Sequence, residues 1–249
     1  MTLEGPLGRG QYSEVKLGRL KDDTLVAVKC LELNRIAKTL RFLRRELAIM
    51  REARHPNIVR YLGCYKDDKT LYISMELCST SLRERMQNEL KLPEEFVRKV
   101  ARQTIDALAY LHKKKIAHRD IKPENILLDS NGDVKLVDFG LSRVLTDQQV
   151  TVVGTPYYLA PEVLGGVYSF ECDMWSLGVV LYFALFGCVP FKAEDSSMLF
   201  HRIANVRPTF PQEASPDSVS FLQRLLSKNP KRRMTPAEAF THPWLSNQP

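Results

Sequence analysis

The first third of the chain carries short apolar runs that favour β-strands. Three such runs, rich in β-forming residues, cover 25–33 (LVAVKCLEL), 57–65 (NIVRYLGCY) and 70–77 (TLYISMEL). A helical pattern separates the first run from the second, because apolar residues recur there every three or four positions. That stripe consists of Ile36, Leu40, Leu43, Leu47 and Met50. This part of the chain therefore predicts a small sheet with one main helix.

After the polar stretch CSTS at 78–81, the pattern changes to helices. Pro93, followed by two glutamates, predicts a helix start, and the lysines at 113–115 favour its end at the negative pole of the helix dipole. Between them, residues 97, 100, 104, 108 and 111 follow helical spacing. The change of pattern predicts a hinge at Ser79–Ser81 between a strand-rich small lobe and a helical large lobe.

One long uncharged segment, MWSLGVVLYFALFGCVPF at 174–191, has two interpretations. Its 18 residues reach the lower limit for a membrane span. Two internal glycines and Pro190 argue against a span, because proline ends a helix early. The remaining helical part, about 13 residues, suits a buried core helix. We therefore expect a core helix here and no membrane association.

Length and composition are those of an ordinary globular protein. The chain has 249 residues, 44% hydrophobic and 26% charged, which suits one large domain or two tightly joined lobes. Its five cysteines are odd in number and lack CxxC spacing, which disfavours a disulfide framework or a zinc site. The N-terminus has no apolar core for a signal peptide. These features favour a reducing compartment, cytoplasmic or nuclear.

The chain is basic, with a formal net charge of +7, but its basic runs are scattered. They lie at 44–46 (RRE), 113–115 (KKK) and 231–233 (KRR), each near a helical pattern. Unclustered charge is weak evidence for an anionic partner, so we favour a solvated surface and expect no nucleic acid.

A glycine-rich stretch, LGRGQYSEV at 7–15, opens the strand region. Gly8 and Gly10 let backbone amides approach phosphate groups closely, although a plain hairpin turn fits the same residues. Ser13 takes the place of the third glycine of a GxGxxG pattern. Strands follow instead of a helix, which disfavours a dinucleotide-binding βαβ unit.

Lys29 lies inside an apolar strand, in VAVK. A buried lysine is costly unless a partner balances its charge, and the alternative is a side chain that reaches water at the strand edge. Glu46 borders the buried side of the following helix and is a natural partner. A Lys29–Glu46 pair could position the lysine against phosphate oxygens.

Two further stretches carry the chemistry of phosphate transfer. HRDIKPEN at 118–125 supplies Asp120, Lys122 and Asn125, and VKLVDFG supplies Asp138 at a strand end. Asp120 can accept a hydroxyl proton, and Lys122 can steady a transferred phosphoryl group. The side-chain oxygens of Asn125 and Asp138 are hard ligands that suit Mg²⁺.

In this order and spacing, the motifs resemble those of the eukaryotic protein kinases. The resemblance extends to HPWL at 242–245 and includes GTPYYLAPE at 154–162, DMWSLG at 173–178 and Arg233 in NPKRRMT. It implies an α+β, bilobal protein kinase fold over residues 1–249. A small β-rich N-lobe (1–77) with one main helix would precede the hinge and a larger, mostly helical C-lobe (78–249). It also implies that Glu162 pairs with Arg233 and that Asp173 holds the 118–120 turn.

The resemblance implies a site for ATP with Mg²⁺. In the family, the glycine-rich loop covers the phosphates, a lysine oriented by a glutamate holds them, and the adenine lies against the segment that corresponds to 75–78. The implied nucleotide-binding residues are Leu7, Gly8, Arg9, Gly10, Gln11, Tyr12, Ser13, Glu14, Val15, Ala27, Lys29, Met75, Glu76, Cys78 and Leu127. The implied catalytic residues are Asp120 as base, Lys122, Lys29 and Glu46, with Asn125 and Asp138 as metal ligands.

The same resemblance favours serine and threonine as targets. Lys122 and Thr155 resemble serine/threonine kinases rather than tyrosine kinases, and Leu159 suggests an apolar wall for the residue after the target. The loop motifs look like NIMA-related kinases, whereas 168–191 looks like the calcium/calmodulin-dependent group. No autoinhibitory or calmodulin-binding tail is visible, so calcium control has no support in the sequence.

Two features of the sequence bear on the residues before the target. Basophilic kinases usually carry an acid just after the hinge, but the turn STSL here lacks it. Glu124 remains as an acid for a basic residue two before the target.

Thr151 lies four residues before Thr155, where related kinases are phosphorylated. Arg119 precedes the catalytic base, and Arg143 follows Asp138 by five residues, so we expect their guanidinium groups to lie close together. Such a pair favours a dianionic partner. We therefore predict a regulatory phosphosite at Thr151; the alternative is an ordinary exposed loop threonine.

The sequence thus predicts an ATP-dependent serine/threonine protein kinase whose partners are protein substrates. We expect a monomeric core domain, with transient self-association for autophosphorylation. The alternative is a catalytically weak kinase-fold scaffold that acts by binding nucleotide and protein. A scaffold would be expected to lose Lys29, Asp120 or Asp138, and the chain keeps all three.

Overall fold

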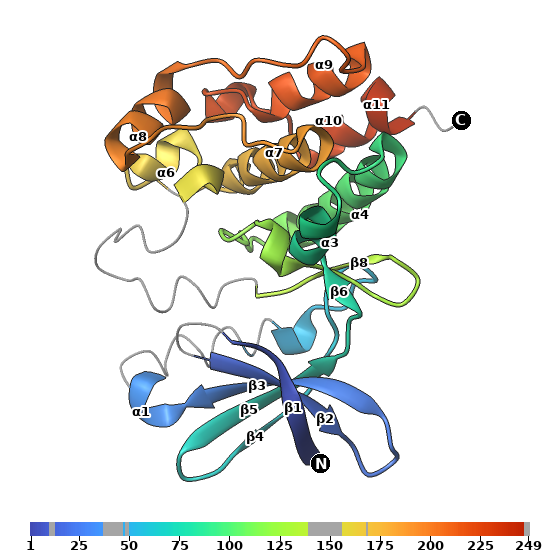
Figure 1. Cartoon of the computed structure of the whole chain (residues 1–249). Helices are drawn as coiled ribbons and strands as arrows, with labels where there is room; N and C mark the ends of the chain where they lie inside the picture. The colour runs from blue at the N-terminus through green and yellow to red at the C-terminus, as the bar shows by residue number, and fades with distance from the viewer. Residues whose placement is uncertain (10–12, 37–46, 48–49, 139–155, 168, 247–249) are drawn as a thin grey trace.

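The structure is a computed structural model of the whole chain. It describes residues 1–9, 13–36, 47, 50–138, 156–167 and 169–246. The segments between them are drawn in grey in Figure 1.

Five antiparallel strands form a sheet in the N-terminal part of the chain (Figure 1). They are β1 (Thr2–Arg9), β2 (Ser13–Arg19), β3 (Leu25–Glu32), β4 (Tyr61–Lys66) and β5 (Thr70–Glu76), paired in the order β1-β2-β3-β5-β4. The short helix α1 (Leu33–Ile36) follows β3. Because side chains alternate along a strand, Val26 and Val28 are buried on one face of β3, while Ala27 and Lys29 share the other.

The strand predicted at 57–65 begins later than its apolar pattern indicates. β4 starts at Tyr61, and the preceding residues leave the sheet to contact β8 (Val134–Leu136). Ile58 forms a β-bridge with Leu136, and the side-chain amide of Asn57 donates to the carbonyl of Val134 at 3.0 Å. The apolar run therefore contributes residues to two sheets.

Most of the helix predicted at 36–50 lies outside the described residues.

Helices dominate the rest of the chain, and a three-stranded sheet lies between them and the larger sheet (Figure 1). The small sheet consists of β6 (Thr80–Ser81), β7 (Ile126–Leu128) and β8. The helices are α3 (Leu82–Asn88), α4 (Glu94–Lys113), α6 (Pro161–Leu164), α7 (Glu171–Phe186), α8 (Ser196–Asn205), α9 (Pro216–Leu225), α10 (Pro236–Phe240) and α11 (Pro243–Ser246), with the 3-10 turns η2 (Pro123–Asn125), η3 (Pro156–Tyr158) and η4 (Pro230–Arg232). The predicted α+β, bilobal fold is confirmed.

The helix predicted after Pro93 is confirmed as α4. Pro93 stands directly before its first turn, and the helix ends among the lysines at 113–115. The predicted stripe is buried: Val97, Val100, Thr104, Leu108 and Leu111. Through that face, α4 packs against α7 in the core of the helical part.

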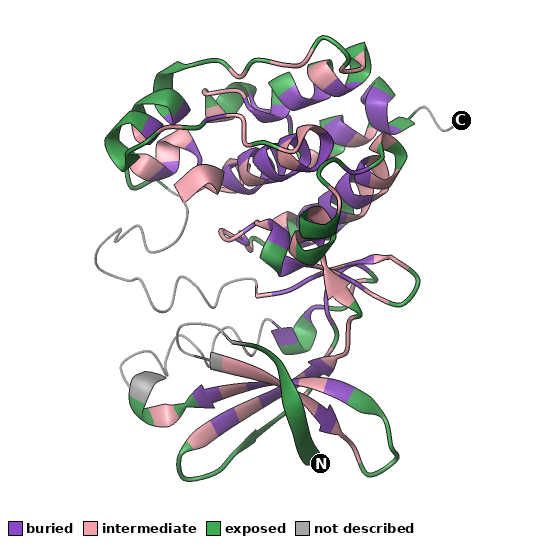
Figure 2. Ribbon diagram, viewed as in Figure 1, coloured by how far each residue is buried: buried purple, intermediate pink, exposed green. Residues whose placement is uncertain are grey.

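The uncharged segment at 174–191 forms most of α7, a core helix as predicted. Twelve of the 16 residues of α7 are buried, which is why the helix is purple along most of its length in Figure 2. The helix ends before Pro190, because Gly187 takes a left-handed φ of 72° that stops the helical backbone. Only glycine fits at this position, since a Cβ atom there would lie 2.5 Å from the carbonyl oxygen of Leu90. Within the described part of the chain, no helix has both the length and the apolar character that crossing a membrane requires.

Candidate active site

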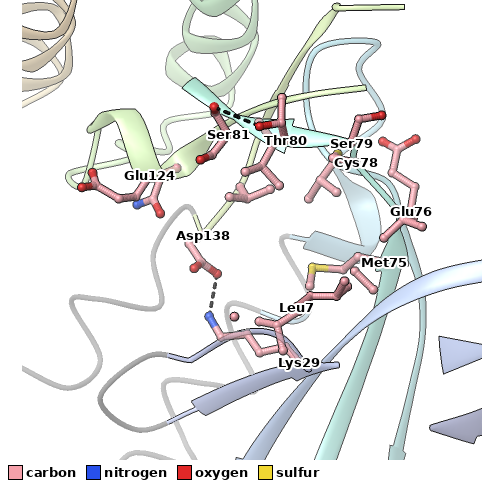
Figure 3. A pocket seen from close by; sticks show the side chains of 18 of the residues that line it. Leu7, Lys29, Met75, Glu76, Cys78, Ser79, Thr80, Ser81, Glu124 and Asp138 are labelled. Carbon is pink, nitrogen blue, oxygen red and sulfur yellow. Dashed lines mark hydrogen bonds and ion pairs between the residues drawn. The ribbon is translucent and has the colours of Figure 1, made fainter. Parts of the chain in front are cut away.

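A cavity of about 330 Å³ lies between the five-stranded sheet and the small sheet with its neighbouring helices (Figure 3). Strands β1 to β3 and the end of β5 supply one wall, and the 77–81 segment, η2, β7 and the residues after β8 supply the other. Eleven residues that the sequence predicted for the site line it: Leu7, Gly8, Val15, Ala27, Lys29, Met75, Glu76, Cys78, Asn125, Leu127 and Asp138.

The remaining predicted nucleotide-binding residues lie elsewhere or are not described. Glu14, on β2, forms an ion pair with Lys16 at 3.2 Å and is not among the lining residues. Arg9 ends β1 and Ser13 begins β2. Several predicted residues lie outside the described part of the chain: Gly10, Gln11, Tyr12, Glu46, Arg143, Thr151 and Thr155.

Lys29 and Asp138 meet inside the cavity. The Lys29 ammonium donates to Asp138 Oδ1 at 2.6 Å, and a dashed line marks this contact between the two labelled side chains in Figure 3. Lys29 is buried, so the carboxylate balances a charge that would otherwise be costly there. The partner expected from the sequence, Glu46, lies outside the described residues, and Asp138 was not expected in that role.

The local backbone turns Asp138 toward the lysine. Asp138 has a φ of 59°, in the left-handed region that residues other than glycine rarely adopt. Enclosure by the protein favours the neutral carboxyl, but the charge and hydrogen bond of Lys29 outweigh this and hold the pKa of Asp138 below its usual value. Asp138 is therefore a carboxylate at neutral pH, which suits a cation ligand.

Asp120 is held by two neighbours on the same turn. Its Oδ2 accepts from Lys122 Nζ at 2.6 Å and from the side-chain amide of Asn125 at 2.8 Å. The same amide also donates to the backbone carbonyl of Asp120 at 2.8 Å. Both contacts use Oδ2, and within the described residues Oδ1 has no recorded partner, so it can receive a proton from an incoming hydroxyl.

His118 fixes the backbone beside Asp120. Its Nε2 lies 2.9 Å from the carbonyl of Val137, which only accepts, so Nε2 carries the hydrogen. Its Nδ1 can then accept the backbone N–H of Asp120 at 3.3 Å. Complete burial lowers the pKa of His118, and the imidazole stays neutral in this tautomer. The ring thus links the end of β8 to the turn that carries Asp120.

Two contacts implied by the family resemblance are present. Buried Asp173, on α7, accepts the backbone N–H groups of His118 at 2.9 Å and Arg119 at 2.7 Å. Arg119 has a φ of 69°, and Asp173 holds this unusual conformation in place. Arg233 donates to both carboxylate oxygens of Glu162, at 2.5 and 2.9 Å. These pairs connect the 118–120 turn and α6 to the helical core.

The adenine-sized part of the cavity has apolar walls. Val15, Ala27 and Met75 line it from strands β2, β3 and β5 of the large sheet, and Leu127 lines it from β7 of the small sheet. Burial raises the pKa of the Cys78 thiol to about 11, so it stays uncharged there. A flat aromatic ring fits walls of this kind.

The cavity also contains residues that the sequence analysis did not select. They are Val59, Glu84 and Val137. Other lining residues belong to segments that the sequence assigned: Leu77 to the 75–78 segment against the adenine, Ser79, Thr80 and Ser81 to the hinge, and Glu124 to the contact with a basic substrate residue. Ser81 and Glu84 form a capping box: each side chain accepts the other's backbone N–H, at 3.1 and 3.0 Å. Its S-x-x-E signature in SLRE was readable from the sequence.

Two side-chain oxygens in the cavity are suitable ligands for a magnesium ion. The Asn125 amide nitrogen is engaged with Asp120, which leaves its Oδ1 as a ligand, and Asp138 uses Oδ1 for Lys29, which leaves Oδ2. Mg²⁺ is commonly held by one or two protein oxygens together with substrate phosphates. Both residues line the same cavity.

An ion pair lies beside the cavity at Glu124, the residue expected to contact the substrate. Glu124 lies 3.7 Å from Arg83 of α3, and both side chains are exposed. Tyr158 is close to both, and burial raises the pKa of its phenol. Leu159, predicted as an apolar wall, is partly buried against the core, and its role stays a prediction.

Comparison with known proteins identifies the family. The family model described as "Protein kinase domain" matches residues 1–245. CDPK-related kinase 7 of Arabidopsis thaliana is 38% identical over 98% of this chain and 45% of its own length. An Aurora kinase of Schizosaccharomyces pombe is 38% identical over 96% of this chain and 70% of its own length. Serine/threonine-protein kinase 36 of Pongo abelii is 37% identical over 96% of this chain and 19% of its own length. The chain spans less than half the length of the first and last of these relatives, and it belongs to the protein kinase domain family.

Proposed function

We propose that this chain transfers the γ-phosphoryl group of ATP to serine and threonine hydroxyls of protein substrates. Residues 1–77 form the N-lobe of one kinase domain, and 78–249 form its hinge and C-lobe. The cavity between the two sheets is the nucleotide site. The names of the similar proteins, which include serine/threonine-protein kinases, support the target class.

The carboxylate of Asp120 carries this proposal. Lys122 and Asn125 both bind its Oδ2, so its Oδ1 faces the substrate as the acceptor of the hydroxyl proton. The tautomer of His118 and the two backbone contacts of Asp173 hold the turn in this orientation. Positioning and charge stabilisation supply most of the catalysis in phosphoryl transfer, and this rigid turn provides the positioning.

The charged groups of the site divide the remaining work. Lys29 binds the α and β phosphates, and Lys122 balances charge on the transferred group. Asn125 and Asp138 hold Mg²⁺, which neutralises the developing charge on the phosphate oxygens when it is bound. The apolar walls around Met75 and Leu127 enclose the adenine and exclude water from it.

The test is phosphorylation of a degenerate peptide library with ATP and Mg²⁺. The wild-type chain should label serine and threonine positions, whereas Asp120→Asn should leave the library almost unlabelled. Labelling of tyrosine alone would contradict the target class. A wild-type chain that binds ATP but labels no peptide would favour a scaffold instead.

The ion pair of Glu124 with Arg83 bears on substrate choice. Because Arg83 already neutralises this carboxylate, a basic residue before the target gains less from Glu124. The library should therefore show a weak preference for arginine at that position, and Arg83→Gln should strengthen it.

We also propose that phosphorylation of Thr151 activates the enzyme. The domain is otherwise monomeric, and two copies associate transiently so that one phosphorylates the other. Arg119 supports this, since Asp173 holds its backbone beside the catalytic turn. A phosphate adds about −1.5 to −2 charge, which guanidinium groups bind by charge-assisted hydrogen bonds. Phosphatase treatment, with mass spectrometry at Thr151, should lower the rate. Thr151→Ala and Arg119→Ala should not be additive, because both remove the same contact; an unchanged rate after complete dephosphorylation would rule out the switch.

A further inference from the structure

A second cavity, about 570 Å³ in volume, lies apart from the Lys29–Asp138 pair, where the 50–61 segment meets the ends of β5 and β8. We call it the basic pocket. Its described lining residues are Met50, Arg51, Ala53, Arg54, His55, Pro56, Ile58, Arg60, Tyr61, Glu76 and Lys135. Four of these are cationic side chains and one is a carboxylate.

The single carboxylate in the pocket is already engaged. Glu76 Oε1 accepts the backbone N–H of Arg60 at 2.7 Å and lies 3.4 Å from Lys135 Nζ. In Figure 3 the Glu76 carboxylate points away from the Lys29–Asp138 pair. Glu76 therefore balances Lys135 and does not serve the arginines.

In the part of the chain that the structure describes, the three arginines of the pocket lack a counter-charge. Arg51, Arg54 and Arg60 are exposed, and no ion pair to their guanidinium groups occurs within the described residues. Glu52 is exposed beside them but does not line the pocket, and Asp106 lies 3.2 Å from His55. Three guanidinium groups at one cavity favour a ligand with several carboxylates.

The frame of the basic pocket is rigid. Two residues of α4 hold the His55 ring. The Asp106 carboxylate contacts its Nε2, and the centre of the Tyr110 ring lies 5.2 Å from the centre of the imidazole. The Tyr110 hydroxyl accepts the backbone N–H of Arg54 at 3.0 Å. Ile58 is bridged to Leu136 of β8. A preformed frame lowers the ordering cost that a ligand would meet on binding.

The size and apolar part of the pocket favour a peptide over a small anion. Met50, Ala53 and Ile58 are buried and give it an apolar floor, and the half-buried ring of Tyr61 borders it. The volume exceeds that of the nucleotide cavity, which leaves room for an apolar side chain between carboxylates. Single-stranded nucleic acid binds on exposed aromatic rings, and among the described lining residues Tyr61 is the one phenyl-type ring.

We propose that the basic pocket docks an acidic segment of a partner protein, with an apolar side chain of that segment on the floor and its carboxylates on Arg51, Arg54 and Arg60. This site is separate from the groups that carry the proposed phosphoryl transfer. It does not depend on that activity, because docking needs none of Asp120, Lys29 or Asp138.

The test is fluorescence polarisation with the whole chain and a fluorescein-labelled peptide, Asp-Asp-Phe-Glu-Asp-Asp. The amide version, Asn-Asn-Phe-Gln-Asn-Asn, should bind at least about ten-fold more weakly, because charge-assisted contacts are lost. The double variant Arg51→Gln/Arg60→Gln should also bind the acidic peptide about ten-fold more weakly, since two guanidinium groups are removed.

The matched control is Arg207→Gln/Arg232→Gln, which removes the same charge at exposed positions elsewhere on the helical part. It should bind the acidic peptide like wild type, and thermal unfolding should show that both double variants are folded. Three results would each overturn the proposal: equal weakening in the two double variants, equal binding of the two peptides, or tighter binding of a uridylate hexamer than of the acidic peptide at the same salt concentration.

Discussion

Lys29 Nζ lies 2.6 Å from Asp138 Oδ1, and this single contact joins the centre of the five-stranded sheet to the loop after β8. The two residues are 109 positions apart in the sequence. The lysine is the proposed phosphate ligand and the aspartate a proposed metal ligand. Each holds the other in the cavity, and the proposed site for ATP and Mg²⁺ uses both charges.

Replacing Lys29 tests this pairing. Lys29→Met should lower phosphoryl transfer by about 10²-fold or more, because an electrostatic contact of the transferring group is lost. Initial rates with ATP and a peptide substrate provide the measurement. Lys21→Met, a change at an exposed lysine after β2, is the control and should keep the wild-type rate. A fully active Lys29→Met protein would exclude the lysine from the mechanism.

The buried pair of Arg233 and Glu162 should make the helical part sensitive to the loss of either partner. The Arg233 side chain is fully buried, and that of Glu162 is 9% exposed. Arg233→Met should lower the free energy of unfolding by about 3–5 kcal/mol, because it leaves a buried carboxylate uncompensated. Urea denaturation measures the loss.

The double variant Arg233→Met/Glu162→Met supplies the control for this pair. It removes both charges, so it should be more stable than Arg233→Met alone. The single variant Glu162→Met completes the comparison. If the double variant loses as much free energy of unfolding, relative to wild type, as the two single variants lose together, the pair is not coupled.

Lys228 gives the stability a pH dependence. Burial, followed by the charge of Arg233, lowers the pKa of Lys228 to about 8. Its ammonium donates to the carbonyl of Ile203 at 2.6 Å and lies 3.9 Å from the centre of the Phe191 ring. The unfolded chain binds the proton more readily than the folded chain between pH 8 and the usual lysine pKa of about 10.4. Stability from this group is therefore highest at alkaline pH and falls as the pH drops toward 8.

The comparison of wild type with Lys228→Met isolates this effect, because other titrating groups cancel in the difference. The free energy of unfolding, measured at pH 7 and pH 9.5, should shift in favour of wild type at the higher pH. A difference that is the same at both values would mean that the lysine is not perturbed.

Much of the fold was predictable because its signals are local. The stripe of α4 and the uncharged run of α7 follow from residue spacing alone, and both helices are buried as expected. The short motifs around Asp120 and Asp138 place the chemistry on one turn and one strand end. Their order in the chain was sufficient to indicate the family, and the family model confirms it.

What the sequence left open depends on contacts between distant residues. An apolar run at 57–65 cannot reveal that Ile58 pairs with β8 while Tyr61 begins β4. The partner of Lys29 depends on how the two sheets meet, and the residue type of Asp138 only weakly indicates its left-handed backbone. The arginines of the basic pocket come from a single stretch, but their shared cavity appears only once β8 is in place. The kinase subgroup stays a prediction.

The most direct measurement of the central proposal is the turnover rate of Asp120→Asn. The amide keeps an acceptor oxygen for Lys122 and Asn125, so the turn should stay folded, but it cannot take up the hydroxyl proton. We predict a fall in kcat of about 10²–10⁴-fold, with the KM for ATP and the thermal unfolding temperature close to wild type. Asp68→Asn, at an exposed aspartate in the β4–β5 turn, should change none of these. A kcat near wild type in purified, folded Asp120→Asn would contradict the account.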